Sequence, residues 1–356
     1  MPRGNIGEWS EAYALAYLLV HGGAFAGDSD QQPIPTQFHK VLKVKLSGLL
    51  EQDNLEYVIN DAQVSRVSGE IISTIASRSS IEDFLTAMLL EFHSKRPRGT
   101  FTLESGVDFL NLIQKNQISA GSNQNVSDLD LTLVDEESGS PTPRIGFNIK
   151  SQIGGRSTLL NASGSTNFTY KILNNSAEAE SVLPVFRHGK HTQNLQALYA
   201  AGYRLEFYCM KSDTFQNSLT LIDMLFPQHL AKILLESYLS GEDDFERVVS
   251  ACFPEDQISS RQPLFKIKEF LGAIAMGLRP SKIWDGDNSR FSGIIVVKPD
   301  GDLVFYYLDT RKNFEQYLFK NVAFERPSTT RHKYGSIFSE NGENFLSLNL
   351  QIRFKS

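Results

Sequence analysis

Cysteine is scarce in this chain: its 356 residues include only Cys209 and Cys252. Two cysteines make neither a disulfide framework nor a four-ligand zinc site, so a reducing compartment is expected. Apolar runs long enough to span a bilayer are also lacking, which argues against a membrane protein. The N-terminal stretch is interrupted by Glu8 and Glu11 and does not read as a secretory signal peptide. We therefore expect a cytoplasmic protein with no membrane partner.

An excess of basic charge is lacking as well. The chain has 35 Lys and Arg against 41 Asp and Glu, a net charge of −6, which argues against a wholly basic surface. A local basic patch stays compatible with this balance, and residues 311–356 carry 8 Lys or Arg against 4 Asp or Glu. The length suits one large or two modest domains. The asymmetry weakly favours a polyanionic partner for the C-terminal part.

Two predicted strands carry the polar residues on which a function can be argued. Residues 128–134 and 145–151 each alternate apolar and polar side chains, and a loop with glycine and proline joins them. This pattern predicts an antiparallel hairpin. Because strand side chains alternate between faces, Asp128 lies on the polar face of the first strand, while Asn148 and Lys150 share that of the second. A carboxylate and an ammonium group are expected to converge.

Such a pair suits the hydrolysis of phosphodiesters. Carboxylates bind Mg²⁺ through oxygen, the metal neutralises charge on the phosphoryl oxygens, and a lysine orients the attacking water. The two strands resemble the PD-(D/E)XK nuclease core, with Ser127-Asp128 for "PD" and Asn148-Ile149-Lys150 for "(D/E)XK". Asp130, on the same face as Asp128, is the alternative first carboxylate. A surface hairpin with ordinary solvated side chains is the competing interpretation.

Asn148 stands where the motif has its second carboxylate, so that group is expected from elsewhere. A helix is predicted to begin near Asn5, and Glu8 three residues later fits a capping box. Glu11 has no comparable structural role. Many nucleases of this core present a glutamate from an early helix, which makes Glu11 the candidate, with Glu8 and a merely solvated Glu11 as alternatives.

The segment after Lys150 is dense in small hydrogen-bonding side chains and glycines. Such groups can contact phosphates or base edges, although a polar turn region would have the same composition. The candidate DNA contacts in this segment are Gln152, Arg156, Ser157, Thr158 and Asn161.

The C-terminal part predicts β-hairpins, because Asp-Gly and Asn-Gly turn signals separate strand-like residues 293–298 from 302–308 and residues 335–339 from 345–354. Two-stranded ribbons fit the major groove of DNA. Just before the second hairpin lie Arg331, His332 and Lys333, three further candidate DNA contacts. Arg331 can pair with a guanine edge through two hydrogen bonds, and a phosphate contact is its alternative.

Three blocks carry a more specific resemblance. They are GNIGEWSEAYAL, then GFNIKSQIGGRSTLLNASGSTNFTYKI, then STTRHKYG with LNLQIRF, and in this order they resemble the HpaII-type restriction endonucleases. The resemblance implies a type II restriction endonuclease that cuts double-stranded DNA at a short palindrome, CCGG in that family, and depends on Mg²⁺. Similar enzymes have serine in the position of Asn148, so the missing carboxylate is shared.

The resemblance and the two polar faces together predict the roles of the site residues. Asp128 and Glu11 are expected to hold Mg²⁺ with the carbonyl oxygen of Ile149, Asn148 is a further oxygen ligand, and Lys150 positions the attacking water. If the target is CCGG, the donors expected to face the guanines are Arg331, Lys333, Arg156 and Gln152.

The expected fold class is α/β (α+β mixed). A restriction-endonuclease-like core would fill residues 1–240, with a central mixed sheet flanked by helices, and residues 241–356 would form a β-rich, DNA-contacting region. A palindromic target favours a homodimer, although a monomer that nicks each strand in turn stays open. A bacterial cytoplasmic location and a cognate methyltransferase that protects the host genome without direct contact would complete the restriction-modification system. A repair or recombination nuclease without a fixed site, or a DNA-binding protein with a degenerate nuclease site, are the alternatives.

Overall fold

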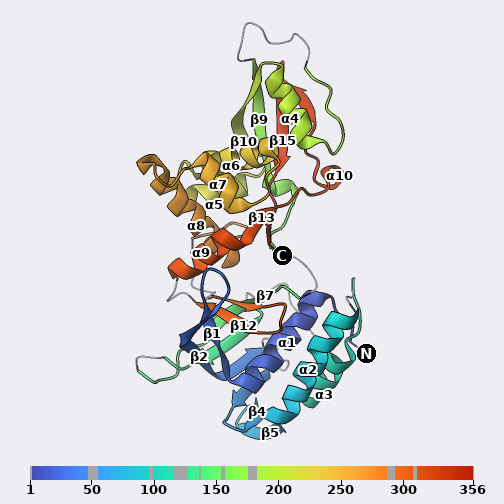
Figure 1. The fold of residues 1–356 in the computed structure, drawn as a ribbon, viewed down its shortest axis with the longest axis vertical. Helices are drawn as coiled ribbons and strands as arrows, with labels where there is room; N and C mark the ends of the chain where they lie inside the picture. The colour runs from blue at the N-terminus through green and yellow to red at the C-terminus, as the bar shows by residue number, and fades with distance from the viewer. Residues whose placement is uncertain are drawn as a thin grey trace. The chain divides into compact units, whose positions relative to one another are not determined.

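Two compact units make up the chain (Figure 1). The computed structural model describes residues 2–46, 55–95, 99–115, 127–135, 138–153, 157–174, 183–286, 293–307 and 311–355. Unit 1 comprises residues 1–157, 288–317 and 356, and unit 2 comprises residues 158–287 and 318–355. The predicted division into 1–240 and 241–356 does not coincide with these units, because residues 158–240 belong to unit 2 and residues 288–317 return to the sheet of unit 1.

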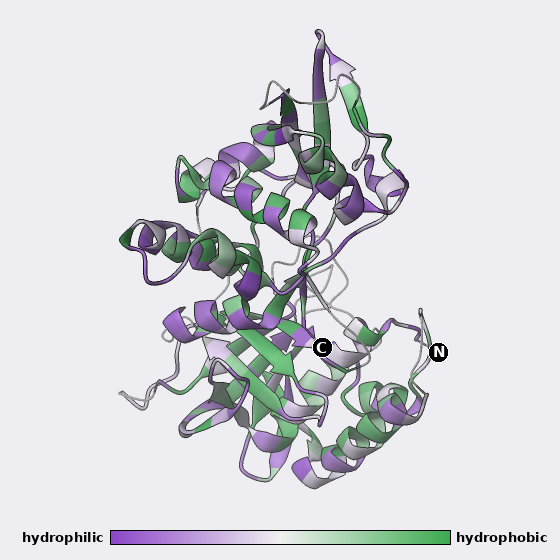
Figure 2. Ribbon diagram, turned by 45° about the horizontal axis from the view of Figure 1, so that its top comes forward, coloured by the Kyte–Doolittle hydropathy of each residue, from purple (hydrophilic) through white to green (hydrophobic). Residues whose placement is uncertain are grey.

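Unit 1 is built on a nine-stranded mixed sheet in the order β1-β12-β11-β7-β6-β2-β3-β4-β5. The strands are β1 (Gly23–Gly27), β2 (Pro33–Leu46), β3 (Leu55–Ile59), β4 (Gln63–Ser68), β5 (Ile71–Ser77), β6 (Leu129–Leu133), β7 (Ile145–Ser151), β11 (Gly293–Val297) and β12 (Leu303–Tyr307). The long strand β2 pairs with β1 through its first half and with β6 and β3 through its second. The apolar character of the central strands shows in Figure 2.

Three helices of unit 1 lie side by side against the sheet: α1 (Ile6–His21), α2 (Arg78–Lys95) and α3 (Glu104–Leu112) (Figure 1). Helix α1 is almost wholly buried because small and apolar residues fill it from Ala12 to Val20. Its ends are defined locally. The Asn5 side chain caps the start, and Gly22 ends the helix in the left-handed conformation with φ 68°.

The predicted hairpin of residues 128–134 and 145–151 is confirmed. Strands β6 and β7 are antiparallel, with Leu129 opposite Phe147 and Leu131 opposite Ile145. On its other side β7 pairs in parallel with β11, so that Ile295 lies opposite Ile149. Strand β7 is thus held on both edges, and backbone pairing fixes the residues it carries.

Unit 2 combines a four-stranded antiparallel sheet, β10-β9-β15-β14, and a three-stranded one, β13-β16-β8, with helices. Its strands are β8 (Thr158–Leu160), β9 (Asn167–Asn174), β10 (Tyr203–Met210), β13 (Val322–Phe324), β14 (Ile337–Glu340), β15 (Glu343–Asn349) and β16 (Ile352–Phe354). Its helices are α4 (His191–Ala200), α5 (Asp213–Ile222), α6 (Phe226–Ser240), α7 (Phe245–Cys252), α8 (Arg261–Ala275) and α10 (Thr329–His332), with short 3₁₀ turns at Gly164–Thr166 and Ile258–Ser260. The unit boundary falls within α9 (Arg311–Asn321).

The mixed α/β class and the large mixed sheet flanked by helices are as predicted. The role expected for the first C-terminal hairpin is corrected: β11 and β12 pair with each other, but they also pair with β7 and β1. Both strands are therefore interior to a sheet and cannot enter a DNA groove as a free ribbon. Among the described residues, no helix is long and apolar enough to cross a membrane.

Candidate active site

Asp128 forms two hydrogen bonds with the backbone of strand β7. They lie on either side of Asn148, which stands where the nuclease motif has its second acid. Its backbone amide donates to the carbonyl oxygen of Phe147 at 3.0 Å, and its carboxylate Oδ2 accepts from the amide of Ile149 at 2.7 Å. Asn148, between these two residues, is 8% exposed. The hydrogen bond to Ile149 orients the Asp128 carboxylate directly beside the residue that precedes Lys150.

Glu11 and Glu8 are separated by the structure into two roles. The Glu8 carboxylate accepts from the Asn5 amide at 2.7 Å, and the Glu8 amide donates to the Asn5 side chain at 3.1 Å, which confirms the predicted capping box. Glu11 lies one turn further along α1, partly buried, and lines a small pocket in unit 1 together with Asp128. Of the two glutamates, Glu11 is the one beside the Asp128 carboxylate.

Burial raises the pKa of Glu11 from its ordinary 4.5 to about 8. The Asp128 carboxylate raises the pKa of Glu11 further, and Lys115 and Lys150 lower it. Glu11 thus interacts electrostatically with both Asp128 and Lys150. Two carboxylates that repel each other in a partly buried pocket form an environment that a divalent cation stabilises.

Asp130, the alternative first carboxylate, has a different surrounding. Its carboxylate accepts a hydrogen bond from the Ser127 hydroxyl, and the residue lies opposite Lys45 of β2. Asp128, in contrast, lines the pocket together with Glu11 and raises the pKa of Glu11. The geometry therefore favours Asp128 as the partner of Glu11.

Sequence reasoning missed Lys115, a lysine that is only 9% exposed and lines the same pocket as Glu11 and Asp128. Gln114 adopts a left-handed φ of 57°, and the Lys115 amide then donates to the Leu110 carbonyl at 2.8 Å. This turn ends α3 and fixes the backbone of Lys115. Burial lowers the pKa of Lys115, and Glu11 opposes that shift. The hint in the sequence was a lysine directly after an apolar helical pattern.

A buried hydrogen bond joins helix α1 to strand β7. The Ser10 hydroxyl donates to the Ser151 hydroxyl at 2.8 Å, and both residues are less than 10% exposed. Ser10 directly precedes Glu11, and Ser151 directly follows Lys150. This contact therefore positions the predicted carboxylate and the predicted lysine relative to each other.

The donor set fits a hard cation with few protein ligands. Within the described residues, no group of three or more His, Cys, Asp or Glu side chains is placed to hold a metal. Mg²⁺ is commonly bound by one or two carboxylates, with water and substrate phosphate as its other ligands. Asp128 and Glu11 could supply those two carboxylates, and the Ile149 carbonyl and the Asn148 amide are further oxygen donors nearby.

The predicted DNA contacts are divided between the two units. Gln152 and Ser157 belong to unit 1, and the Gln152 amide donates to the Val297 carbonyl at 2.9 Å. Thr158 and Asn161 belong to unit 2, while Arg156 lies outside the described residues. The structure thus does not bring this set together within one unit, and its role in DNA binding stays a prediction.

Arg331, His332 and Lys333 form the end of the short helix α10 in unit 2, where Arg331 and Lys333 are exposed and His332 is partly buried.

Strand β16 pairs with β8, with Arg353 opposite Thr158. The second and third blocks of the family resemblance therefore meet in unit 2.

Comparison with known proteins places the chain in a class. Type II restriction enzyme HpaII of Haemophilus parainfluenzae is 34% identical over 366 aligned positions, which cover 99% of this chain and 98% of that enzyme. The chain is a type II restriction endonuclease, a site-specific deoxyribonuclease. The model of the HpaII restriction endonuclease family matches residues 5–354, so the chain belongs to this family. No solved structure gives a significant match.

Proposed function

We propose that this enzyme hydrolyses phosphodiester bonds of double-stranded DNA at the palindrome CCGG, with Mg²⁺ as cofactor. The observation that carries the proposal is that Glu11 and Asp128 line one pocket, while the Asp128 carboxylate accepts from the amide of Ile149, the residue before Lys150. The CCGG target rests on the family to which the chain belongs.

The site residues divide the chemistry among them. Asp128 and Glu11 would hold Mg²⁺, with the Ile149 carbonyl oxygen and Asn148 as further ligands. When bound, Mg²⁺ neutralises negative charge that develops on the phosphoryl oxygens. Lys150 positions the water that attacks phosphorus in line with the leaving oxygen. Asp128 also holds the backbone next to Lys150 through its hydrogen bond with Ile149.

The arrangement supports a PD-(D/E)XK-like core. An acidic residue at the start of one strand lies beside a neighbouring strand that ends in lysine, and a helix against the sheet supplies a glutamate. In this interpretation Glu11 takes over the charge that Asn148 lacks. Lys115 would then partly balance the charge of Glu11.

Neither alternative is favoured by the family comparison. A nuclease without a fixed target would not be expected to match a site-specific family along nearly its whole length. A degenerate site would not be expected to retain Glu11 and Asp128 together in a partly buried pocket, because burying two carboxylates without a ligand is costly. Homodimeric action, a cognate methyltransferase and a bacterial cytoplasmic location stay predictions.

The experiment that tests this function is digestion of a sequenced plasmid with and without Mg²⁺, followed by mapping of the ends. We expect discrete fragments that end at CCGG sites with Mg²⁺ and none with EDTA, and restoration when Mg²⁺ is added back. A smear would favour a nuclease without a fixed target. An intact plasmid under all conditions would contradict the proposed function.

Base recognition gives a separate prediction for Arg331, which is exposed at the end of α10. If it pairs with a guanine edge, Arg331→Ala should cost about 1–3 kcal/mol of discrimination between CCGG and a site with one changed base pair. The measurement is cleavage of matched and mismatched duplexes, with the exposed Arg261→Ala as control. An equal loss on both duplexes would assign Arg331 to the phosphate backbone instead.

A further inference from the structure

Unit 2 contains a pocket of about 470 Å³ that the proposed active site does not use. Two segments far apart in the sequence form its walls: the loop before and at the start of α4, and the helix α10 with the turn that follows it. Its lining includes Arg187, His188, His191, Thr329, Lys333 and Ser347. Among the residues that the structure describes, no aspartate or glutamate lines it.

The basic side chains of the pocket are exposed to solvent. Arg187, His188 and Lys333 are all exposed. Hydroxyl groups of Thr329, Thr330, Ser336 and Ser347 complete a lining that suits an anion with several acceptor oxygens. Positive side chains and hydroxyl donors without competing carboxylates are the features of a phosphate-binding surface.

The first wall, the loop before α4, is fixed by hydrogen bonds to the buried side-chain amide of Asn194. The side chain of Asn194, which is 6% exposed, accepts from the Arg187 amide at 2.9 Å and donates to the Arg187 carbonyl at 2.7 Å. Both backbone groups of Arg187 are thereby fixed to helix α4. The loop presents Arg187 from a defined position, which lowers the entropy cost of binding.

The second wall, at the end of α10, is also fixed by buried asparagine side chains. Asn167 and Asn349 are fully buried; the Asn349 side-chain nitrogen donates to Asn167 Oδ1 at 2.6 Å, and the Asn167 side-chain nitrogen donates to the His332 carbonyl at 2.9 Å. Lys333 follows in a left-handed conformation with φ 52°. Two separate buried networks thus position the two exposed cations.

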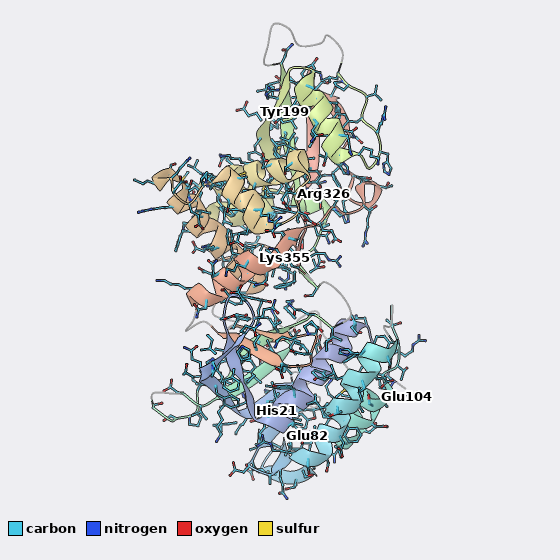
Figure 3. The ribbon with its side chains drawn as sticks, viewed as in Figure 1. His21, Glu82, Glu104, Tyr199, Arg326 and Lys355 are labelled. Atoms are coloured by element: carbon cyan, nitrogen blue, oxygen red, sulfur yellow. The ribbon has the colours of Figure 1, made fainter. Side chains whose placement is uncertain are left out.

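His191, at the start of α4, packs against residues of the second wall. Its ring stacks on Tyr334 at a centroid distance of 5.3 Å and meets Tyr238 edge-on at 5.6 Å. Arg326, which is labelled in Figure 3, places its guanidinium 4.0 Å from the centre of the Tyr238 ring. A Cβ on Gly335 would lie 2.6 Å from the His191 ring, so only glycine permits this approach. Burial lowers the pKa of His191, which makes it a neutral wall rather than a source of charge.

From this geometry we infer that the pocket of unit 2 binds a backbone phosphate of the DNA substrate, with Arg187 and Lys333 as its charged contacts. The inference rests on the proposed function and deepens it. Lys333 is thereby reassigned from the guanine contact expected from the sequence to the phosphate backbone. Arg331 does not line the pocket and stays the candidate base contact.

The test compares two double variants of the full-length enzyme. The pocket variant is Arg187→Gln with Lys333→Asn, because asparagine tolerates the left-handed backbone at residue 333. The matched control is Arg261→Gln with Lys282→Asn, which removes two exposed cations of unit 2 that do not line the pocket. Binding to a CCGG duplex and to a scrambled duplex is measured with Ca²⁺ in place of Mg²⁺ over a range of salt concentrations.

We expect the pocket variant to lose affinity equally for both duplexes. The slope of log affinity against log salt should become shallower by about 0.9, which is the contribution of the one phosphate that the two cations neutralise together. The control variant should retain the wild-type slope, and the melting temperatures of both variants should match that of the wild type.

Equal binding and equal slopes for the pocket and control variants would overturn the inference. A loss confined to the CCGG duplex would also overturn it, because it would mean base recognition. Should the pocket variant melt at a lower temperature than the wild type, the single variant Arg187→Gln, which changes an exposed side chain, must still make the salt slope shallower than that of the wild type for the inference to stand. If the wild-type protein cuts CCGG and the pocket variant behaves like the control, only this inference is refuted. Wild-type protein that neither binds nor cuts DNA would refute the proposed function itself.

Discussion

Replacing Lys150 by alanine is expected to reduce DNA cleavage by about 10³-fold while DNA affinity stays nearly unchanged. Lys150 follows the residue whose amide donates to the Asp128 carboxylate, so its ammonium group is presented where the attacking water is expected. Its removal takes away a charge at the reacting phosphate without disturbing the two-sided pairing of β7.

Asp128→Asn should have a comparable effect for a different reason. Asparagine retains an acceptor for the Ile149 amide, so the local backbone is preserved, and what is lost is the negative charge that would hold the cation. Single-turnover cleavage and filter binding would be measured for both variants. Lys43→Ala is the matched control, because Lys43 lies on β2 of the same sheet and is half exposed beside Glu56. Cleavage at the wild-type rate by either site variant would remove that residue from the mechanism.

Glu11→Gln is expected to abolish Mg²⁺-dependent cleavage, whereas Glu8→Gln should leave it nearly intact. Glutamine at position 8 can still serve the capping box, because its side-chain oxygen can accept from the Asn5 amide. Glutamine at position 11 removes the second carboxylate of the site. Cleavage by these two variants over a range of Mg²⁺ concentrations decides between them. The opposite pattern would mean that Glu8 is the metal ligand.

Although Glu11→Gln should abolish cleavage, we expect this substitution to stabilise the folded protein at high pH. The folded-state pKa of Glu11 is raised from 4.5 to about 8, so the folded state binds this proton more tightly than the unfolded state. Stability is therefore lost as pH rises from about 4.5 to about 8. In EDTA, Glu11→Gln should thus gain melting temperature over the wild type above about pH 8 and little at about pH 5. A melting-temperature difference independent of pH would contradict the assigned environment.

Local features of this fold were predictable from the sequence. The capping box of Asn5 and Glu8 and the alternation of β6 and β7 are each contained in a few consecutive residues. Around residues 70–75, in contrast, the sequence pattern predicts a helix, whereas Ile71–Ser77 form β5, which pairs with β4. Ile71 and Ile72 are exposed, so backbone pairing with a neighbouring strand decides the structure where side-chain burial does not.

Long-range pairing was not predictable in the same way. Strand β11 aligns Ile295 with Ile149, a contact between residues far apart in the chain, and this pairing returns residues 288–317 to unit 1. The sequence showed a hairpin at β11 and β12 but not which sheet it would join. The predicted division at residue 240 differs from the observed units partly for this reason and partly because residues 158–240 belong to unit 2.

The candidate site was predictable only in part. The hairpin indicated Asp128 and Lys150, and the early helix indicated Glu11. Lys115 was not indicated, because its approach to Glu11 depends on the turn at Gln114 and on how α3 packs. The basic pocket of unit 2 was missed likewise, since the loop at Arg187 and the turn at Lys333 meet only in the folded chain.

The most direct test of the central claim is to locate the cation itself, by anomalous scattering from Mn²⁺ in crystals of the enzyme with a CCGG duplex. An ion bridging the carboxylates of Asp128 and Glu11 at about 2.1 Å, with a DNA phosphate oxygen among its ligands and Lys150 facing that phosphate, is the predicted result. An ion bound elsewhere, with Asp128 and Glu11 remote from the DNA, would contradict the account.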